Sequence, residues 1–318
     1  MGRDRSNQTD PADRLTGSGF QEEFMKIAMM GVGNMGAGIA RRLMANGHSI
    51  VAWDLSAPRM AALAEGGAGV AESAQAAARD ADVVITSLLG DSSVEQSVLS
   101  DGGFLASMQP DAIHLCVTTI SPDCANRLAL AHRSHGTRFV AGPVAGRPDA
   151  AAAGQLTTYL AGDRSAVQAV AELASAYAVK IVVLEGPAGL ANAMKLSVNY
   201  TAISIIEIMG EIYAFAEKMG LDRALLRDYF EDAFNRPALK MYANKLHENS
   251  TTGTNGFALV TGLKDVNLMM DAASGCGVNF EVGSIIKRKM LKAIDMGLSE
   301  ADWSSISQVT RSESGIEV

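Results

Sequence analysis

Apolar positions in the first half of the chain fall in short runs separated by segments of helical spacing. Apolar residues three and four apart predict helices at 35–46, 57–65, 121–135 and 164–177. The short runs predict strands at 26–30, 49–54, 82–88, 112–117, 137–141, 156–161 and 180–184. Strands and helices that alternate at this spacing form right-handed crossovers and a mostly parallel sheet. Several runs are apolar throughout, as in strands covered on both faces. We therefore predict a doubly wound α/β domain over residues 25–186.

After Gly186 only helical spacing remains. It predicts a long helix over 187–220, followed by helices at 223–234, 237–248, 257–275 and 281–297 and a short one near Trp303. Residues 187–318 are thus expected to form an all-helical domain, opened by a long helix that links the two domains. Residues 1–24 are polar and lack the apolar segment of a secretory signal, so we expect a disordered leader there.

Composition narrows the class of protein. Among 318 residues, 48% are hydrophobic, which indicates a soluble globular protein with ample material for a core. The chain has 27 basic and 35 acidic residues and no Lys/Arg run, so we expect neither a nucleic acid nor a membrane as partner. Three cysteines form neither a disulfide framework nor a CxxC pair, which is typical of a reducing cytoplasm. Cys116 lies in an apolar run and is expected to be buried.

A glycine motif stands where the first predicted strand meets the first predicted helix. In Gly31-x-Gly33-x-x-Gly36, the first glycine permits a tight turn, the second lets the backbone approach a pyrophosphate, and the third allows close packing of helix on strand. The helix N-terminus adds free N–H groups and partial positive charge. A glycine-rich turn without a ligand is the alternative, but strand, turn, helix and a later acidic residue together favour a dinucleotide.

That acidic residue is Asp54, at the end of the second predicted strand and 54 − 36 = 18 residues beyond Gly36. Its carboxylate can accept hydrogen bonds from a ribose diol and repels a 2′-phosphate, which favours NAD over NADP. Ser56 and Arg59 follow closely and are able to bind a phosphate, so NADP remains open.

Four segments extend the pattern over most of the chain. They are Met30–Gly36, Val117–Pro122, Gly142–Gly146 with Ala153–Thr157, and Gly186–Asn199, and shorter matches occur at Leu88–Leu89 and Gly262–Val266. From Met25 to Gln308 this arrangement resembles the β-hydroxyacid dehydrogenase family, which includes 3-hydroxyisobutyrate dehydrogenase and has a 6-phosphogluconate dehydrogenase-like NAD-binding domain. The resemblance implies a Rossmann-type first domain, an NAD(P)-dependent oxidoreductase, a small carboxylate substrate with a β-hydroxyl or the matching semialdehyde, and a homodimer or homotetramer.

The resemblance also implies two sets of binding residues. The cofactor set comprises Gly31, Gly33, Asn34, Met35, Gly36, Leu88, Leu89, Thr119 and Lys264, to which Asp54 is added. The substrate set comprises Thr118, Ala145, Gly146 and Arg147.

Lys195 and Asn199 stand four residues apart on the predicted long helix, so both face the same way. Oxidation of an alcohol needs a base for the hydroxyl proton, and a lysine serves when its pKa is lowered. This chemistry requires no metal, and the sequence shows no His/Cys cluster with zinc spacing. The resemblance implies an acid/base role for Lys195 and a substrate-positioning role for Asn199. A lysine that merely extends to solvent is the alternative.

Three positions depart from the family. It usually has Ser-Gly-Gly where this chain has Ala145-Gly146-Arg147, and proline where Leu89 stands. Arg147 either binds a substrate carboxylate or lies in solvent. The altered loop keeps an imine reductase of the same architecture open, although Lys195 argues against it, because such relatives usually carry another residue there. A dinucleotide-binding protein without catalysis is the other alternative, and the presence of Lys195 and Asn199 disfavours it. Elsewhere, we expect His114 to be packed in a strand and His132 to act as a partial cation near a helix end.

Overall fold

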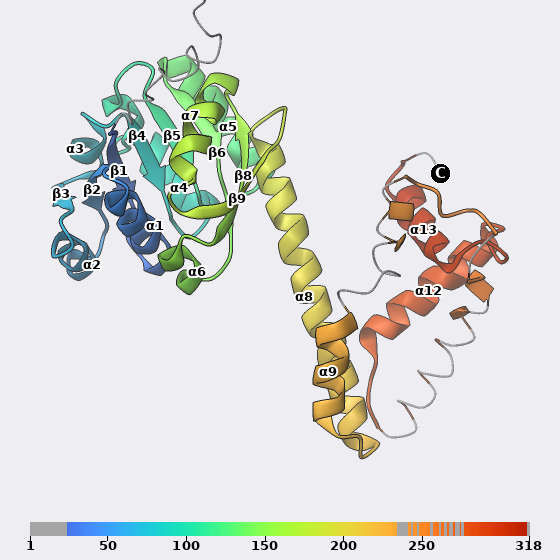
Figure 1. Ribbon diagram of the computed structural model, residues 1–318. Coiled ribbons are helices and arrows are strands. Elements are labelled where there is room, and N and C mark those ends of the chain that lie inside the picture. Colours follow the sequence, from blue (N-terminus) through green and yellow to red (C-terminus); the bar gives the residue numbers. More distant parts are fainter. Residues whose placement is uncertain are drawn as a thin grey trace, which may run out of the picture. The chain divides into compact units, whose positions relative to one another are not determined.

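Figure 1 shows the computed structural model of the chain, which contains two compact units, Met1–Val198 and Asn199–Val318. The structure describes residues 24–233, 241–242, 244–246, 248–254, 257–260, 262–263, 266, 270, 274 and 277–316. In parts of helices α8 and α9 only the backbone is described. The predicted leader falls almost entirely outside these residues.

A nine-stranded sheet forms the centre of the first unit. Its order is β3-β2-β1-β4-β5-β6-β8-β7, with β9 paired to β8. Neighbours from β3 to β6 are parallel, whereas β8 is antiparallel to β6 and β7 and parallel to β9. The strands are β1 (Lys26–Met30), β2 (Ser49–Trp53), β3 (Gly69–Val70), β4 (Val83–Thr86), β5 (Ile113–Cys116), β6 (Arg138–Ala141), β7 (Val144–Ala145), β8 (Leu156–Gly162) and β9 (Ala178–Val183). The predicted mostly parallel sheet is confirmed.

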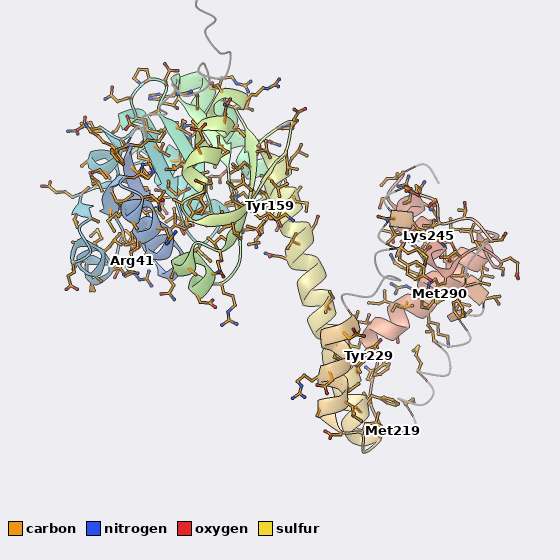
Figure 2. All side chains as sticks on the ribbon, in the orientation of Figure 1. Arg41, Tyr159, Met219, Tyr229, Lys245 and Met290 are labelled. Carbon is orange, nitrogen blue, oxygen red and sulfur yellow. The ribbon has the colours of Figure 1, made fainter. Side chains whose placement is uncertain are left out.

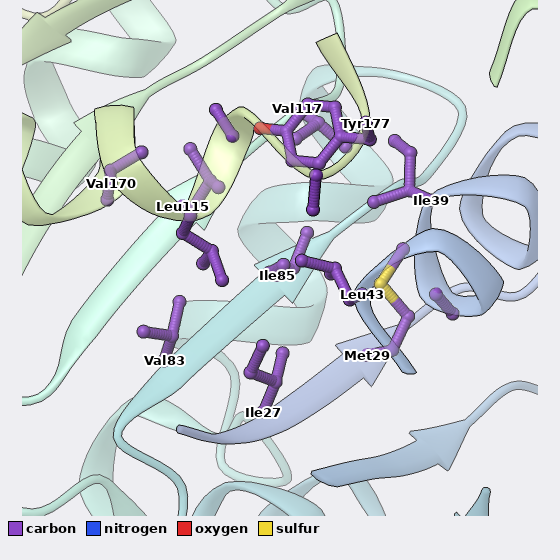
Figure 3. Close-up of a cluster of buried hydrophobic side chains, with 14 of the residues drawn as sticks. Ile27, Met29, Ile39, Leu43, Val83, Ile85, Leu115, Val117, Val170 and Tyr177 are labelled. Carbon is purple, nitrogen blue, oxygen red and sulfur yellow. The ribbon is translucent and has the colours of Figure 1, made fainter. Parts of the chain in front are cut away.

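Helices cover both faces of this sheet (Figure 1). One face packs against α1 (Asn34–Ala45), α2 (Ala57–Ala64), α6 (Pro148–Ala153) and α7 (Arg164–Ala174). The other packs against α3 (Ala74–Ala78), α4 (Asp91–Leu99), η2 (Leu105–Ser107) and α5 (Pro122–His135). Figure 3 shows the core of the first face, where Ile27, Ile85 and Leu115 from neighbouring strands meet Ile39 and Leu43 of α1. The predicted double winding is confirmed because both faces carry a buried apolar cluster.

The second face buries a chain of hydrogen bonds between two histidines and two threonines. Thr86 Oγ1 lies 2.9 Å from His114 Nε2, His114 Nδ1 lies 2.9 Å from His132 Nε2, and His132 Nδ1 lies 2.9 Å from Thr137 Oγ1. Thr137 Oγ1 donates its one hydrogen to the His132 carbonyl, so it accepts from His132 Nδ1. When both rings are neutral, every hydrogen bond of the chain is donated in the same direction: Thr86 donates to His114, His114 to His132, and His132 to Thr137.

Both histidines are therefore buried in neutral form. Burial lowers the pKa of His114 well below its usual value and that of His132 to about 3. The predicted packing of His114 is confirmed, and Cys116 is buried as expected. The prediction of a partial cation at His132 was wrong, because desolvation against β5 outweighs the attraction of the helix end.

The described parts of the second unit are mainly helical. They include α8 (Gly189–Lys218, which begins in the first unit), α9 (Arg223–Ala233), α12 (Glu281–Asp295), η3 (Trp303–Ser305) and α13 (Ile306–Glu313). The predicted helices at 237–248 and 257–275 lie partly outside the described residues. Met290, labelled in Figure 2, packs in a small core with Leu259 and Val309, and Lys245 forms a 2.8 Å ion pair with buried Asp302. Within the described residues, no helix has the length and apolar character needed to span a membrane.

Candidate active site

The glycine loop lies where β1 ends. Gly31 N donates to the Trp53 carbonyl at 2.9 Å, and Gly31 has a φ of +88° that favours glycine. A Cβ on Gly31 would lie 2.4 Å from the Ser87 carbonyl oxygen, and one on Gly36 would lie 2.1 Å from the Gly31 oxygen. Gly33 differs, since a Cβ there would meet only the Arg59 guanidinium, at 4.0 Å. The space above Gly33 is thus open to a ligand.

Helix α1 starts directly after this open position. Gly33 is its N-cap, no side chain caps it, and its first turn has no acidic residue. Its N-terminal N–H groups and the positive end of its dipole therefore remain available to an anion. Asn34 is exposed and Met35 half-buried in this first turn. An open cradle at the N-terminus of a 12-residue helix fits the pyrophosphate of a dinucleotide.

Asp54 borders the same loop. Its Oδ2 accepts a hydrogen bond from Val32 N and its Oδ1 one from Ser56 N, both at 2.8 Å. Each carboxylate oxygen keeps a free lone pair, so the group can still accept from a ribose diol. The Arg59 guanidinium, beside Gly33, brings a positive charge to the same edge.

The ends of β4 and β5 form the next part of this edge. Thr118 Oγ1 accepts from Leu88 N at 2.8 Å and donates to the Thr86 carbonyl at 3.2 Å. Leu88 contacts the glycine loop, since its Cδ2 lies 2.8 Å from the Cβ position of Gly31. Leu89 is fully exposed and Thr119 half-buried. The structure thus gathers Gly31, Asp54, Leu88 and Thr118 along the carboxyl ends of adjacent parallel strands.

The predicted substrate loop leaves the sheet beside β5. Gly142 N donates to the Cys116 carbonyl at 2.8 Å, which sets the start of the loop next to the end of that strand. Ala145 is half-buried in β7, and Gly146 has a φ of +138°. The Arg147 side chain is 89% exposed and lies 3.6 Å from Asp149 in a solvent-exposed ion pair.

Helix α8 carries the candidate base. Its first turn is bound to the first unit by two amides, since Asn126 Oδ1 accepts from Gly189 N at 2.9 Å and Asn192 Oδ1 accepts from Ile120 N at 3.0 Å. Lys195, one turn further on, is only 8% exposed. Burial lowers the pKa of Lys195, and within the described residues no carboxylate pairs with it.

Asn199 follows one turn beyond Lys195 on the unbroken helix and is exposed. Lys264 lies outside the described residues.

Sequence comparisons identify what this site belongs to. Residues 26–186 match the family described as the NAD binding domain of 6-phosphogluconate dehydrogenase. Residues 189–310 match the one described as NAD-binding of NADP-dependent 3-hydroxyisobutyrate dehydrogenase. The chain belongs to the β-hydroxyacid dehydrogenase family. It is accordingly an NAD(P)-binding oxidoreductase of the hydroxyacid dehydrogenase type.

Individual relatives span nearly the whole chain. The uncharacterized oxidoreductase YfjR of Bacillus subtilis is 33% identical over 89% of this chain and 98% of its own length. The NAD-dependent L-serine dehydrogenase of Pseudomonas aeruginosa is 29% identical over 89% of this chain and 97% of its own. An imine reductase from Myxococcus stipitatus in complex with NAD+ superposes with a TM-score of 0.83 over 90% of this chain and 99% of its own. At 13% identity, that last likeness shows the fold alone.

Sequence reasoning missed the two asparagines that attach α8 of this dehydrogenase to the first unit, Asn192 through the loop after β5 and Asn126 through α5. The sequence could have indicated Asn192, because Asn192, Lys195 and Asn199 stand at i, i+3 and i+7 and share one helix face. Asn126 carried no such pattern, because its partner, Gly189, is 63 residues away.

Proposed function

We propose that this β-hydroxyacid dehydrogenase transfers a hydride between NAD(P) and a small 3-hydroxy acid or its semialdehyde, with Lys195 as acid and base. The observation that carries the proposal is the burial of Lys195 one turn from the loop that follows β5. Burial lowers the pKa of Lys195 and so brings the titration of the amine nearer to neutrality, where a general base works best.

The bound cofactor supplies the hydride acceptor or donor at its nicotinamide ring. In oxidation, the neutral Lys195 amine takes the hydroxyl proton of the substrate. In reduction, the ammonium returns a proton to the developing alkoxide. Asn199, one turn along the same helix face, is proposed to orient the substrate by hydrogen bonding. Gly33 and the first turn of α1 are proposed to hold the pyrophosphate, with Asn34 and Met35 beside it.

We further propose that the substrate is a small carboxylate held by the loop over 145–147. Arg147 is exposed, and its ion pair with Asp149 is long and solvated, so little energy is lost when it turns to a substrate. A guanidinium binds a carboxylate with two parallel hydrogen bonds. Thr118, whose hydroxyl is already bonded to Leu88 and Thr86, would shape the site.

NAD is the proposed preference over NADP. Asp54 supports it, because a carboxylate at this edge accepts from the ribose diol and repels a 2′-phosphate. Arg59 favours NADP instead, since its positive charge near Gly33 attracts a phosphate. The preference is therefore expected to be moderate.

An absorbance screen of nicotinamide reduction and oxidation tests the proposal. L-serine, the substrate in the name of one relative, and 3-hydroxyisobutyrate, named by the matched family, are offered with NAD and with NADP. Semialdehydes and cyclic imines are offered with the reduced cofactors. The Lys195→Met variant, which keeps the side-chain volume without the amine, is the control.

Turnover of a hydroxy acid or semialdehyde that is lost in Lys195→Met supports the proposal. Turnover of imines alone, or cofactor binding without any turnover, contradicts it. Full activity of Lys195→Met would remove the lysine from the mechanism.

A further inference from the structure

Asn192 connects the helix of the candidate base to the loop that carries Thr118 and Thr119. Its Oδ1 accepts from Ile120 N at 3.0 Å, and the residue is fully buried in the first turns of α8. The neighbouring residues Ala188, Ala191 and Ile120 pack in one apolar cluster with the second face of the sheet. The Asn192 bond therefore ties α8 to the loop within a buried, largely apolar environment.

The orientation of the Asn192 amide follows from this bond. A backbone N–H requires an acceptor, so the oxygen faces Ile120 and Nδ2 faces away from it. Nδ2 is inaccessible to solvent and has no hydrogen-bond partner within the described residues. A buried donor without a partner destabilises the folded state. Attachment of α8 explains only the amide oxygen of Asn192. It does not explain the Nδ2 donor, which destabilises the folded state while it has no partner.

The position of Lys195 offers a partner for the buried Nδ2 donor of Asn192. Lys195 follows Asn192 by three residues, on the same face of α8. Helical side chains lean towards the N-terminus of their helix, so Lys195 leans over the turn that contains Asn192. A neutral amine has a lone pair that accepts from an amide N–H, whereas an ammonium can only donate.

We propose that Asn192 is a positioning residue for Lys195, with its amide oxygen holding α8 on the loop after β5 and its amide N–H holding the lysine amine in place in the neutral form. The inference rests on the acid/base role proposed above. Burial lowers the pKa of Lys195, and among the described residues no charged side chain contributes to this shift. An amide N–H that donates to the neutral amine would favour the neutral form in the same direction.

Competitive labelling with acetic anhydride across neutral and alkaline pH tests this arrangement without requiring turnover. Mass spectrometry of the peptide containing Lys195 reports the apparent pKa of that amine in the full chain. The variants are Asn192→Asp, Asn192→Ala and, as matched control, Asn126→Ala, which removes the other amide bond to α8. Asn192→Asp keeps an oxygen for Ile120 N but replaces the donor by an anion, so the apparent pKa should rise by about 1 unit or more.

If the buried carboxylate of Asn192→Asp prevents folding, Asn192→Ala tests the positioning role instead. It removes the donor without adding charge, so the apparent pKa should rise by a smaller but measurable amount, and kcat should fall about 10-fold or more with KM for the cofactor unchanged. Asn126→Ala should leave the labelling curve of Lys195 in place. No shift in either Asn192 variant, or an equal shift in Asn126→Ala, would overturn the inference. Full activity of Lys195→Met would instead defeat the proposed function, whatever the labelling shows.

Discussion

At the scale of single residues, burial lowers the pKa of the candidate base Lys195, and among the described residues no neighbouring charge contributes to this shift. Lys195→Met should lower kcat by about 10²–10⁴-fold, the usual contribution of a general base, with the cofactor dissociation constant unchanged. Because burial favours the neutral amine and lowers the pKa of Lys195, alcohol oxidation should reach its plateau at a lower pH than an ordinary lysine would allow. Single-turnover rates and pH profiles check this. A profile that still rises where free lysine titrates would contradict it.

We predict that two opposite charges near the glycine loop, those of Asp54 and Arg59, set the choice of cofactor. Asp54→Ala should weaken NAD more than NADP, because it removes acceptors for the ribose diol. Arg59→Ala should do the reverse, since its guanidinium is near the loop and able to bind a phosphate. Each effect should be about 10-fold, the scale of one hydrogen bond to a charged group. Titration of both cofactors against both variants measures it, and equal losses in one variant would exclude that residue from ribose recognition.

Arg147 provides the third residue-scale test. Arg147→Ala should raise KM for a carboxylate substrate about 10-fold or more while kcat changes little, as expected when ground-state binding is lost. Asp149→Ala is the matched control, because it removes the exposed ion pair and keeps the guanidinium. If KM is the same in Arg147→Ala and the parent protein, the side chain lies in solvent throughout the reaction.

At the scale of elements, the turn between β1 and α1 contains two glycines with different predicted roles. Gly33 is predicted to leave space for the cofactor, and Gly36 to let the helix pack against the strand. Gly33 has φ −65° and ψ −174°, which alanine adopts freely, and a Cβ there meets nothing closer than 4.0 Å. Gly33→Ala should therefore keep or slightly raise Tm while weakening the cofactor about 10-fold or more, because the methyl group occupies the space of the pyrophosphate.

Gly36→Ala is the contrasting variant. Its Cβ would lie 2.1 Å from the backbone oxygen of Gly31, so the helix cannot remain against the strand. We expect a lower Tm as well as weaker cofactor binding. Calorimetry and cofactor titration on both variants distinguish the roles. A drop in Tm for Gly33→Ala would contradict the open cradle.

Elements with clear periodicity were predictable from the sequence. β1 matches its apolar run residue for residue, and the other predicted strands agree to within a few residues at each end. β3 and β7 were missed because two residues carry no period, and their pairing depends on neighbouring strands. His132 was misread because its place near a helix end is visible in the sequence, whereas its burial against β5 is a property of the fold. Asn126 was missed for the same reason.

At the scale of the whole molecule, α8 belongs to both units. The sequence pattern changes at Gly186, and the two family matches end at 186 and begin at 189. Contacts, however, divide the chain after Val198, because the first turns of α8 pack on the sheet domain. Lys195 thus lies in the helical family region by sequence and in the α/β unit by packing. The position of the candidate base is therefore set by packing within the α/β unit.

The buried histidine pair makes the stability of the first unit depend on pH. In the unfolded chain both histidines titrate near pH 6.5, whereas in the folded unit burial lowers both pKa values, that of His132 to about 3. Unfolded histidines therefore bind protons first as pH falls, and stability that is complete above 6.5 is lost below it. At pH 5 the loss should reach about 2 kcal/mol for each histidine. Carboxylates with lowered pKa, such as Asp91 and Asp163, lose their contribution only at lower pH.

The two tryptophans allow this loss to be measured in one unit, since Trp53 lies in β2 and Trp303 in the second unit. In a Trp303→Phe background, urea unfolding followed by Trp53 fluorescence should show stability falling steadily from pH 7 to about pH 5. The double variant His114→Phe/His132→Phe should be less stable at pH 7, because Thr86 and Thr137 lose their partners, but nearly independent of pH in this window. His135→Gln, which changes an exposed histidine on the same helix, should keep the parent slope. A slope that survives in the double variant would show that the acid sensitivity arises elsewhere than in the Thr86–His114–His132–Thr137 chain.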